Sequence, residues 1–140
     1  TLLIAACDAS GQVKTWQLGD GILVARIAGL FQLLTPARSG FGNETQAMGI
    51  DRAWSAWTTH QFTLQQAGDM VALMTDGVSE DLRPEGLASF PTALYRQLHR
   101  TSRRQGRRWL EYELTNWSTP GHSDDKTMAV VFMDGVTHGR

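Results

Sequence analysis

The sequence has 140 residues, of which 41% are hydrophobic, and a formal net charge of −1. This size fits a single domain with one hydrophobic core, and so small a net charge argues against a general binder of polyanions. Cys7 is the lone cysteine, which excludes a disulfide framework and a cysteine-based zinc site, and no apolar run approaches the roughly 18 residues of a membrane span.

The first part of the chain is predicted to form strands. Three apolar runs, 2–7, 13–18 and 22–28, are bounded by turn residues, which is typical of β-strands. The segment 19–21 (Gly-Asp-Gly) separates the second run from the third, and Asp-Gly is a strong signal for a tight hairpin. We therefore expect an antiparallel meander of three strands, with Cys7 as a small residue in the core.

The rest of the chain mixes short strands with helices. Strands are predicted over 61–64, 70–75 and 128–133, and helical segments over 79–82, 85–90, 109–118 and from Pro91 through the arginines that follow it. Residues 35–53 show no clear period and are predicted to form an irregular loop. The hairpin-like connections favour antiparallel strands in an α+β fold. Strands that are apolar on both faces must be packed against other layers on both faces. The sequence therefore predicts an antiparallel β-sandwich flanked by helices.

Three aspartates are predicted to gather at one edge of a sheet. Asp76 follows the strand 70–75 and Asp124 precedes the strand 128–133, so both lie at the same edge if these strands are antiparallel neighbours. Asp20 joins them if its turn points the same way. Carboxylate oxygens at such an edge suit Mg²⁺ or Mn²⁺, and a bound cation would relieve their mutual repulsion. The alternative is that these aspartates are ordinary turn residues.

Four motifs resemble the type 2C family of metal-dependent serine/threonine protein phosphatases, in its bacterial form. The segment 75–80 (TDGVSE), preceded by a Gly-Asp turn and an apolar strand, resembles the family's second acidic motif. The segment 124–127 (DDKT) resembles the family's last motif. The segment 18–21 (LGDG) resembles its Gly-Asp-Ser hairpin, and 33–35 (LLT) resembles the Leu-Thr that follows. The motifs stand in the family's order.

The resemblance implies a role for each matching residue. Asp76 and Asp124 match aspartates that hold a pair of Mg²⁺ or Mn²⁺ ions, and Asp20 with Asp76 match the pair associated with an additional, weaker metal. Asp125 stands where the family usually has Asn and is expected to orient its neighbours, while Gly77 is a backbone position at a tight turn. The implied reaction is hydrolysis of phosphoserine and phosphothreonine in proteins by a metal-activated water. The implied fold is a sandwich with αββα layers.

The sequence departs from the family pattern in its first half. The family's early acidic residue, its Asp-Gly-(His or Met)-Gly-Gly motif and its phosphate-binding arginine have no counterpart here. We therefore expect residues 1–140 to be the C-terminal portion of a single phosphatase-like domain, with incomplete layers and no activity alone. Unpaired sheet edges would then favour pairing with a second chain. With no signal peptide or membrane span in the sequence, we expect a cytoplasmic location.

Two other functions stay open at the level of sequence. One is a phosphatase-like module that has lost catalysis and binds a regulatory partner. The other is a binder of an acidic protein or nucleic acid, because the spacing of Arg96, Arg100, Arg103 and Arg107 places them on one face of a helix. The small net charge argues against nucleic acid, and a solvated surface helix is the simpler interpretation of these arginines.

Overall fold

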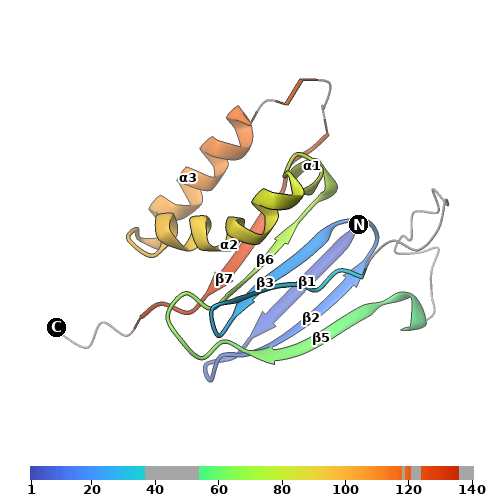
Figure 1. Cartoon of the computed structure of the whole chain (residues 1–140), viewed down its shortest axis with the longest axis vertical. Coiled ribbons are helices and arrows are strands. Elements are labelled where there is room, and N and C mark those ends of the chain that lie inside the picture. Colours follow the sequence, from blue (N-terminus) through green and yellow to red (C-terminus); the bar gives the residue numbers. More distant parts are fainter. Residues whose placement is uncertain (37–53, 118, 121–123, 136–140) are drawn as a thin grey trace.

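The computed structural model describes residues 1–36, 54–117, 119–120 and 124–135, which form two antiparallel β-sheets and a layer of helices (Figure 1). The strands are β1 (Leu2–Cys7), β2 (Gln12–Leu18), β3 (Ile22–Ile27), β4 (Leu30–Leu33), β5 (Thr58–Thr63), β6 (Met70–Met74) and β7 (Met128–Phe132). The helices are α1 (Asp76–Ser79), α2 (Pro84–Leu98) and α3 (Arg103–Asn116), with a short 3₁₀ helix η1 (Trp54–Ala56). The predicted α+β class is confirmed.

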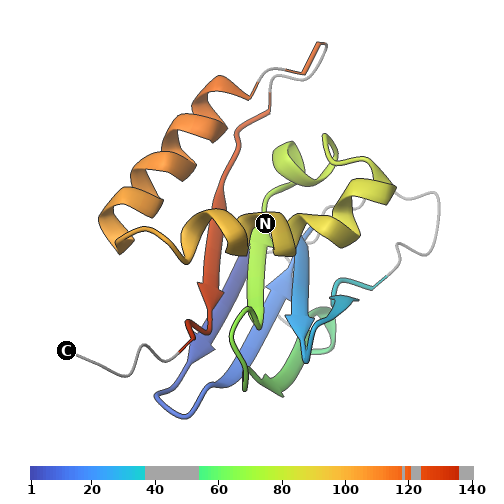
Figure 2. The same cartoon turned by 60° about the vertical axis from the view of Figure 1, so that its left-hand side comes forward.

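The layers run from helices through a four-stranded sheet to a three-stranded sheet (Figure 2). The four-stranded sheet has the order β4-β3-β6-β7, and the three-stranded sheet has the order β1-β2-β5. Among the described elements no helix covers the outer face of the three-stranded sheet, which agrees with the incomplete αββα sandwich predicted. Among the described residues no further strand pairs with the outer strands of either sheet, and dimerisation through these edges stays a prediction. None of the described helices is long and apolar enough to cross a membrane.

Two hydrophobic cores hold the three layers together. The core between the sheets contains Val13, Leu23, Ala25, Leu34, Leu64, Val71 and Leu73. The core between the four-stranded sheet and the helices contains Val24, Met70, Ala72, Met74, Val78, Leu94 and Leu98. β6 contributes alternate residues to both cores and all five of its residues are buried, which explains why its sequence is apolar without alternation.

The predicted meander is wrong at its third strand. β1 and β2 pair antiparallel, but β3 lies in the other sheet, between β4 and β6. The segment 19–21 therefore carries the chain from one sheet to the other. The physical reason is burial: Leu23, Val24 and Ala25 are all 0% exposed, and of the two described sheets only the four-stranded one is covered on both faces.

Buried hydrogen bonds fix this crossover. The Nε2 of Gln17 donates to the carbonyl oxygen of Gly21 at 2.6 Å, and its Oε1 accepts from the Thr35 hydroxyl at 2.8 Å. The same hydroxyl oxygen accepts from the Leu23 amide at 2.7 Å. A Cβ on Gly21 would lie 2.8 Å from the carbonyl oxygen of Met74, so the crossover passes directly beside the end of β6.

The hairpin between β3 and β4 has no clear signal in the sequence. Its two-residue turn has positive φ at both positions, 51° at Ala28 and 80° at Gly29. Asn-Gly or Asp-Gly is the usual sequence of such a turn, and alanine rarely occupies its first position. A strand predicted to run through Ala28 therefore ends at Ile27, and the chain turns back to pair β4 with β3.

The turn between β1 and β2 is built around a carboxylate. The Oδ1 of Asp8 accepts from the Ser10 hydroxyl at 2.7 Å and from the amides of Ser10 and Gln12, both at 2.9 Å. These hydrogen bonds hold the pKa of Asp8 below its usual value, and the bond from the Ser10 side chain has the largest effect. Cys7 is exposed where the strand enters this turn, so its predicted place in the core is wrong.

The helix α2 is one helix where the sequence predicts two. Pro91 lies inside it and is buried, and the helix continues on both sides. A proline removes one hydrogen bond to the preceding turn. Packing of the apolar face, which includes Leu94 and Leu98, outweighs that loss because tertiary contacts supply most of the stability of a helix.

The single arginine face predicted across the helices is wrong. α2 ends at Leu98, and α3 begins after Ser102, whose hydroxyl and the side chain of Gln105 form a reciprocal capping box. This box satisfies free amides at the start of α3 and fixes a new helix start there. As a result Arg96 lies on α2, whereas Arg103 lies on α3, in a different helix.

Candidate functional site

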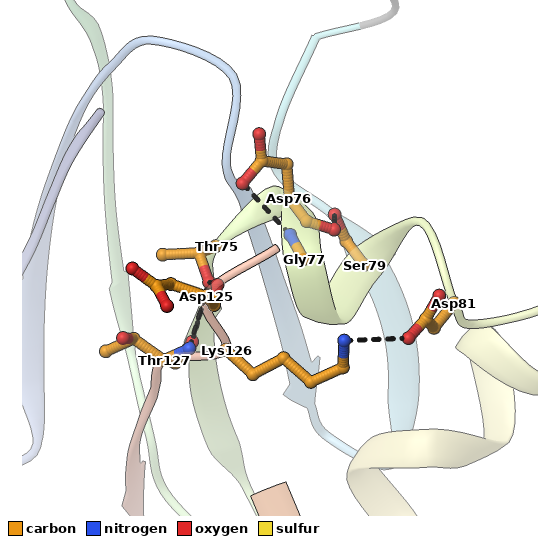
Figure 3. A network of polar contacts seen from close by, with 8 residues as sticks. All are labelled: Thr75, Asp76, Gly77, Ser79, Asp81, Asp125, Lys126 and Thr127. Atoms are coloured by element: carbon orange, nitrogen blue, oxygen red, sulfur yellow. Dashed lines mark hydrogen bonds and ion pairs between the residues drawn. The ribbon is translucent and has the colours of Figure 1, made fainter. Parts of the chain in front are cut away.

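The pairing of β6 with β7 brings the two predicted acidic segments together. The strands are antiparallel neighbours, with Met74 opposite Met128. One residue further, the Thr75 amide donates to the Thr127 carbonyl oxygen at 3.1 Å, and the Thr75 hydroxyl oxygen accepts from the Thr127 amide at 3.0 Å (Figure 3). The ladder thus continues beyond the strands, and the antiparallel arrangement required to bring Asp76 and Asp124 to one edge is the one observed.

The short helix α1 positions Asp76. The Asp76 carbonyl oxygen accepts from the Glu80 amide at 2.9 Å, and its Oδ1 accepts from the amide of its neighbour Gly77 at 2.9 Å. Val78 is 0% exposed and anchors this turn in the core beneath the helices. Asp76 itself is half-buried, and its carboxylate points away from that of Asp125 (Figure 3).

Gly77 lies against the segment that carries Asp124 and Asp125. A Cβ at this position would be 2.6 Å from the Asp125 carbonyl oxygen and 3.1 Å from both the Cβ and the carbonyl oxygen of Asp124. The Thr75 hydroxyl donates to the same Asp125 oxygen at 3.2 Å. The two acidic segments can approach this closely only because residue 77 has no side chain.

Gly77→Ala is therefore expected to lower the free energy of unfolding by about 1–3 kcal/mol, because a backbone segment must move to admit the methyl group. The matched control is Gly86→Ala in α2, where a Cβ meets nothing within 4 Å. That change should stabilise the protein by about 0.5–1 kcal/mol through helix propensity. Urea unfolding of the two variants measures both effects. Equal stability of Gly77→Ala and the unaltered chain would contradict the close packing described.

Asp20 reaches the same edge through the crossover between the sheets. Its neighbour Gly21 lies against the end of β6, and its carboxylate accepts a hydrogen bond from the Thr1 hydroxyl. Asp124 and Asp125 are exposed. Three acidic segments, at 19–21, 75–77 and 124–125, thus converge at one edge of the sandwich.

The backbone segments converge more closely than the carboxylates do. In the described part of the chain, no group of three or more His, Cys, Asp or Glu side chains is arranged to hold a metal ion. The chemistry of the donors nevertheless fits a hard cation, because the edge offers carboxylate oxygens and Mg²⁺ or Mn²⁺ prefers them. Asp76, Asp124 and Asp20 are the candidate ligands that the sequence singles out at this edge.

A buried ion pair that the sequence does not reveal lies beside these aspartates. The Nζ of Lys126 lies 3.1 Å from the Oδ2 of Asp81, and their side chains are only 8% and 1% exposed (Figure 3). The pair joins the segment before β7 to the segment after α1. A lysine next to two aspartates gives no sign of such a partner, since the pairing depends on how the chain folds. His122, two residues before Asp124 in the sequence, lies outside the described residues.

The fold and the acidic edge agree with a known class of enzyme. The family model described as Protein phosphatase 2C matches residues 1–115, a range that includes Asp20 and Asp76 and stops before Asp124. The match defines the protein as a phosphatase, which is a hydrolase. The chain belongs to the Protein phosphatase 2C family, as the four motifs in its sequence indicate. No curated protein and no solved structure matches the chain.

Proposed function

We propose that this chain serves the metal-dependent hydrolysis of phosphoserine and phosphothreonine in proteins. The observation that carries the proposal is the antiparallel pairing of β6 with β7, which sets Asp76 and Asp124 at one edge in a member of the Protein phosphatase 2C family. Asp124 and Asp125 are exposed, so a phosphorylated residue on another protein can reach this edge.

The proposed role of the edge follows from its donors. Asp76 and Asp124 would hold Mn²⁺ or Mg²⁺, with Asp20 as a further ligand and Asp125 beside them. A bound divalent cation supplies stabilisation of the negative charge that develops on the phosphoryl oxygens. The residues around the aspartates fix the backbone: Val78 anchors α1, and Thr75 bonds to the segment before β7.

The number of candidate metal ligands in the described residues is too small for a complete two-metal site. Fewer than three candidate ligating side chains come together among the described residues, whereas a pair of metal ions needs more oxygen donors. We therefore propose that this chain binds metal weakly and is inactive by itself, and that the complete site needs ligands from outside these residues.

A calorimetric titration with Mn²⁺ tests the proposal. The unaltered chain should bind Mn²⁺ saturably, and Asp76→Asn should weaken binding by at least about tenfold, because it replaces a charged ligand with a neutral one. Asp134→Asn is the matched control, since Asp134 is exposed and follows the other end of β7. Its affinity should be unchanged. The absence of Mn²⁺ binding in all three proteins would contradict the metal site and favour a module that binds partners without catalysis.

A further inference from the structure

The ion pair between Lys126 and Asp81 has an unusual place in this molecule. Lys126 directly follows Asp124 and Asp125 in the sequence, yet its side chain extends away from Asp125 toward Asp81 (Figure 3). With side chains 8% and 1% exposed and 3.1 Å between Nζ and Oδ2, both charged groups are removed from water. The only other lysine of the chain, Lys14, is exposed on β2.

The direction of the Lys126 side chain matters because the residues before it in the sequence are the exposed aspartates of the acidic edge. An ammonium without a carboxylate partner is costly to bury, and the flexible stem of lysine lets it leave a buried site. If Asp81 did not hold it, the nearest exposed carboxylates along the chain would be those of Asp124 and Asp125. An ammonium there would neutralise charge at the edge and compete with a divalent cation.

We propose that Asp81 sequesters the ammonium of Lys126 and so keeps the carboxylates of the acidic edge available to a divalent cation. The inference rests on the proposed function, in which Asp76 and Asp124 hold Mn²⁺ or Mg²⁺. Asp81 is a positioning residue, because it touches neither the cation nor the substrate and acts through Lys126.

The first test needs no metal. Lys126 and Lys14 are the two lysines of the chain, so mass spectrometry can follow the acetylation of each in the same sample. In the unaltered chain Lys126 should react at least about tenfold more slowly than Lys14, because a paired, buried ammonium is shielded. Asp81→Leu should reduce this difference to less than about threefold by removing the carboxylate. Equal rates in the unaltered chain, or continued protection in Asp81→Leu, would overturn the proposal.

The second test measures Mn²⁺ affinity by calorimetry. Asp81→Leu should weaken binding by about tenfold, because the released ammonium competes with the cation. Asp81→Leu/Lys126→Met should restore the affinity to within about threefold of the unaltered chain, since the competitor is gone and an apolar pair replaces the charges. A purely structural role of Asp81 predicts no such recovery. Undiminished binding in the single variant, or persistent weakness in the folded double variant, would overturn sequestration.

The controls separate this inference from the function on which it rests. Circular dichroism establishes that each variant is folded, and Asp81→Asn replaces Asp81→Leu if the latter does not fold. If the metal site itself is wrong, the unaltered chain binds no Mn²⁺, and the proposal falls with it even though Lys126 stays protected from acetylation. If only sequestration is wrong, the unaltered chain binds Mn²⁺, Asp76→Asn weakens this binding, and Asp81→Leu leaves it unchanged.

Discussion

Lys126→Met is expected to lower the free energy of unfolding by about 3–5 kcal/mol, the usual effect of removing one partner from a buried ion pair. The variant keeps the unbranched apolar stem but leaves the Asp81 carboxylate, 1% exposed, without the Lys126 ammonium. Desolvation of that charge is then no longer offset by a cation 3.1 Å away. Urea unfolding at constant pH, followed by circular dichroism, measures the loss.

An exposed ion pair in the same chain provides the control for this prediction. Arg107 and Glu111 on α3 lie 2.9 Å apart, with side chains 81% and 59% exposed. Arg107→Met should change the free energy of unfolding by less than about 1 kcal/mol, because water solvates both charges in either case. Similar losses in Lys126→Met and Arg107→Met would show that the buried position of the Lys126 pair has no energetic consequence.

Leu23→Ala is expected to destabilise the protein by about 2–5 kcal/mol, because it leaves a cavity between the two sheets. Leu23 is 0% exposed and belongs to the core that joins the sheets. Leu30, in the strand paired with β3, is 68% exposed and serves as the control. Leu30→Ala should alter the stability by no more than about 0.5 kcal/mol.

Thermal and urea unfolding of the two leucine variants give the required comparison. The large effect of Leu23→Ala follows from the position of β3 inside the sandwich rather than at the end of a meander. Were both variants equally stable, β3 would not be covered on both faces, and the arrangement of the sheets would have to be revised.

Several strands were predictable because their sequences carry local signals. The buried run before Asp76 and the run after Asp124 are apolar without alternation, and turn residues bound them. Three helices separate these two strands in the sequence, so their antiparallel pairing, which brings the acidic segments together, is known only from the structure. The segment 19–21 carries a local signal that does not determine the fold around it. Asp-Gly signals a turn, but which sheet receives the next strand depends on where both faces of that strand can be buried.

The candidate site was predictable in its place but not in its details. The sequence places Asp76 after one apolar strand and Asp124 before another, and the structure shows that these strands are antiparallel neighbours. The direction of each carboxylate depends on contacts that form after folding, such as the bond from the Gly77 amide to Asp76. The partner of Lys126 was hidden for the same reason, because Asp81 is brought to it by the packing of α1 against the segment before β7.

The crossover between the sheets also fixes an order of assembly during synthesis. The hairpins β1–β2 and β3–β4 join residues close in sequence and can form as soon as they leave the ribosome. The other neighbour of β3 comes much later, since Ile22 pairs with Met74 and β6 in turn pairs with β7 at Met128. Until β6 has been made, one edge of β3 has no partner and its apolar faces stay uncovered, which is a state prone to aggregation. The four-stranded sheet gains its inner strand β6 only after Met74 has been translated and its edge strand β7 only after Phe132.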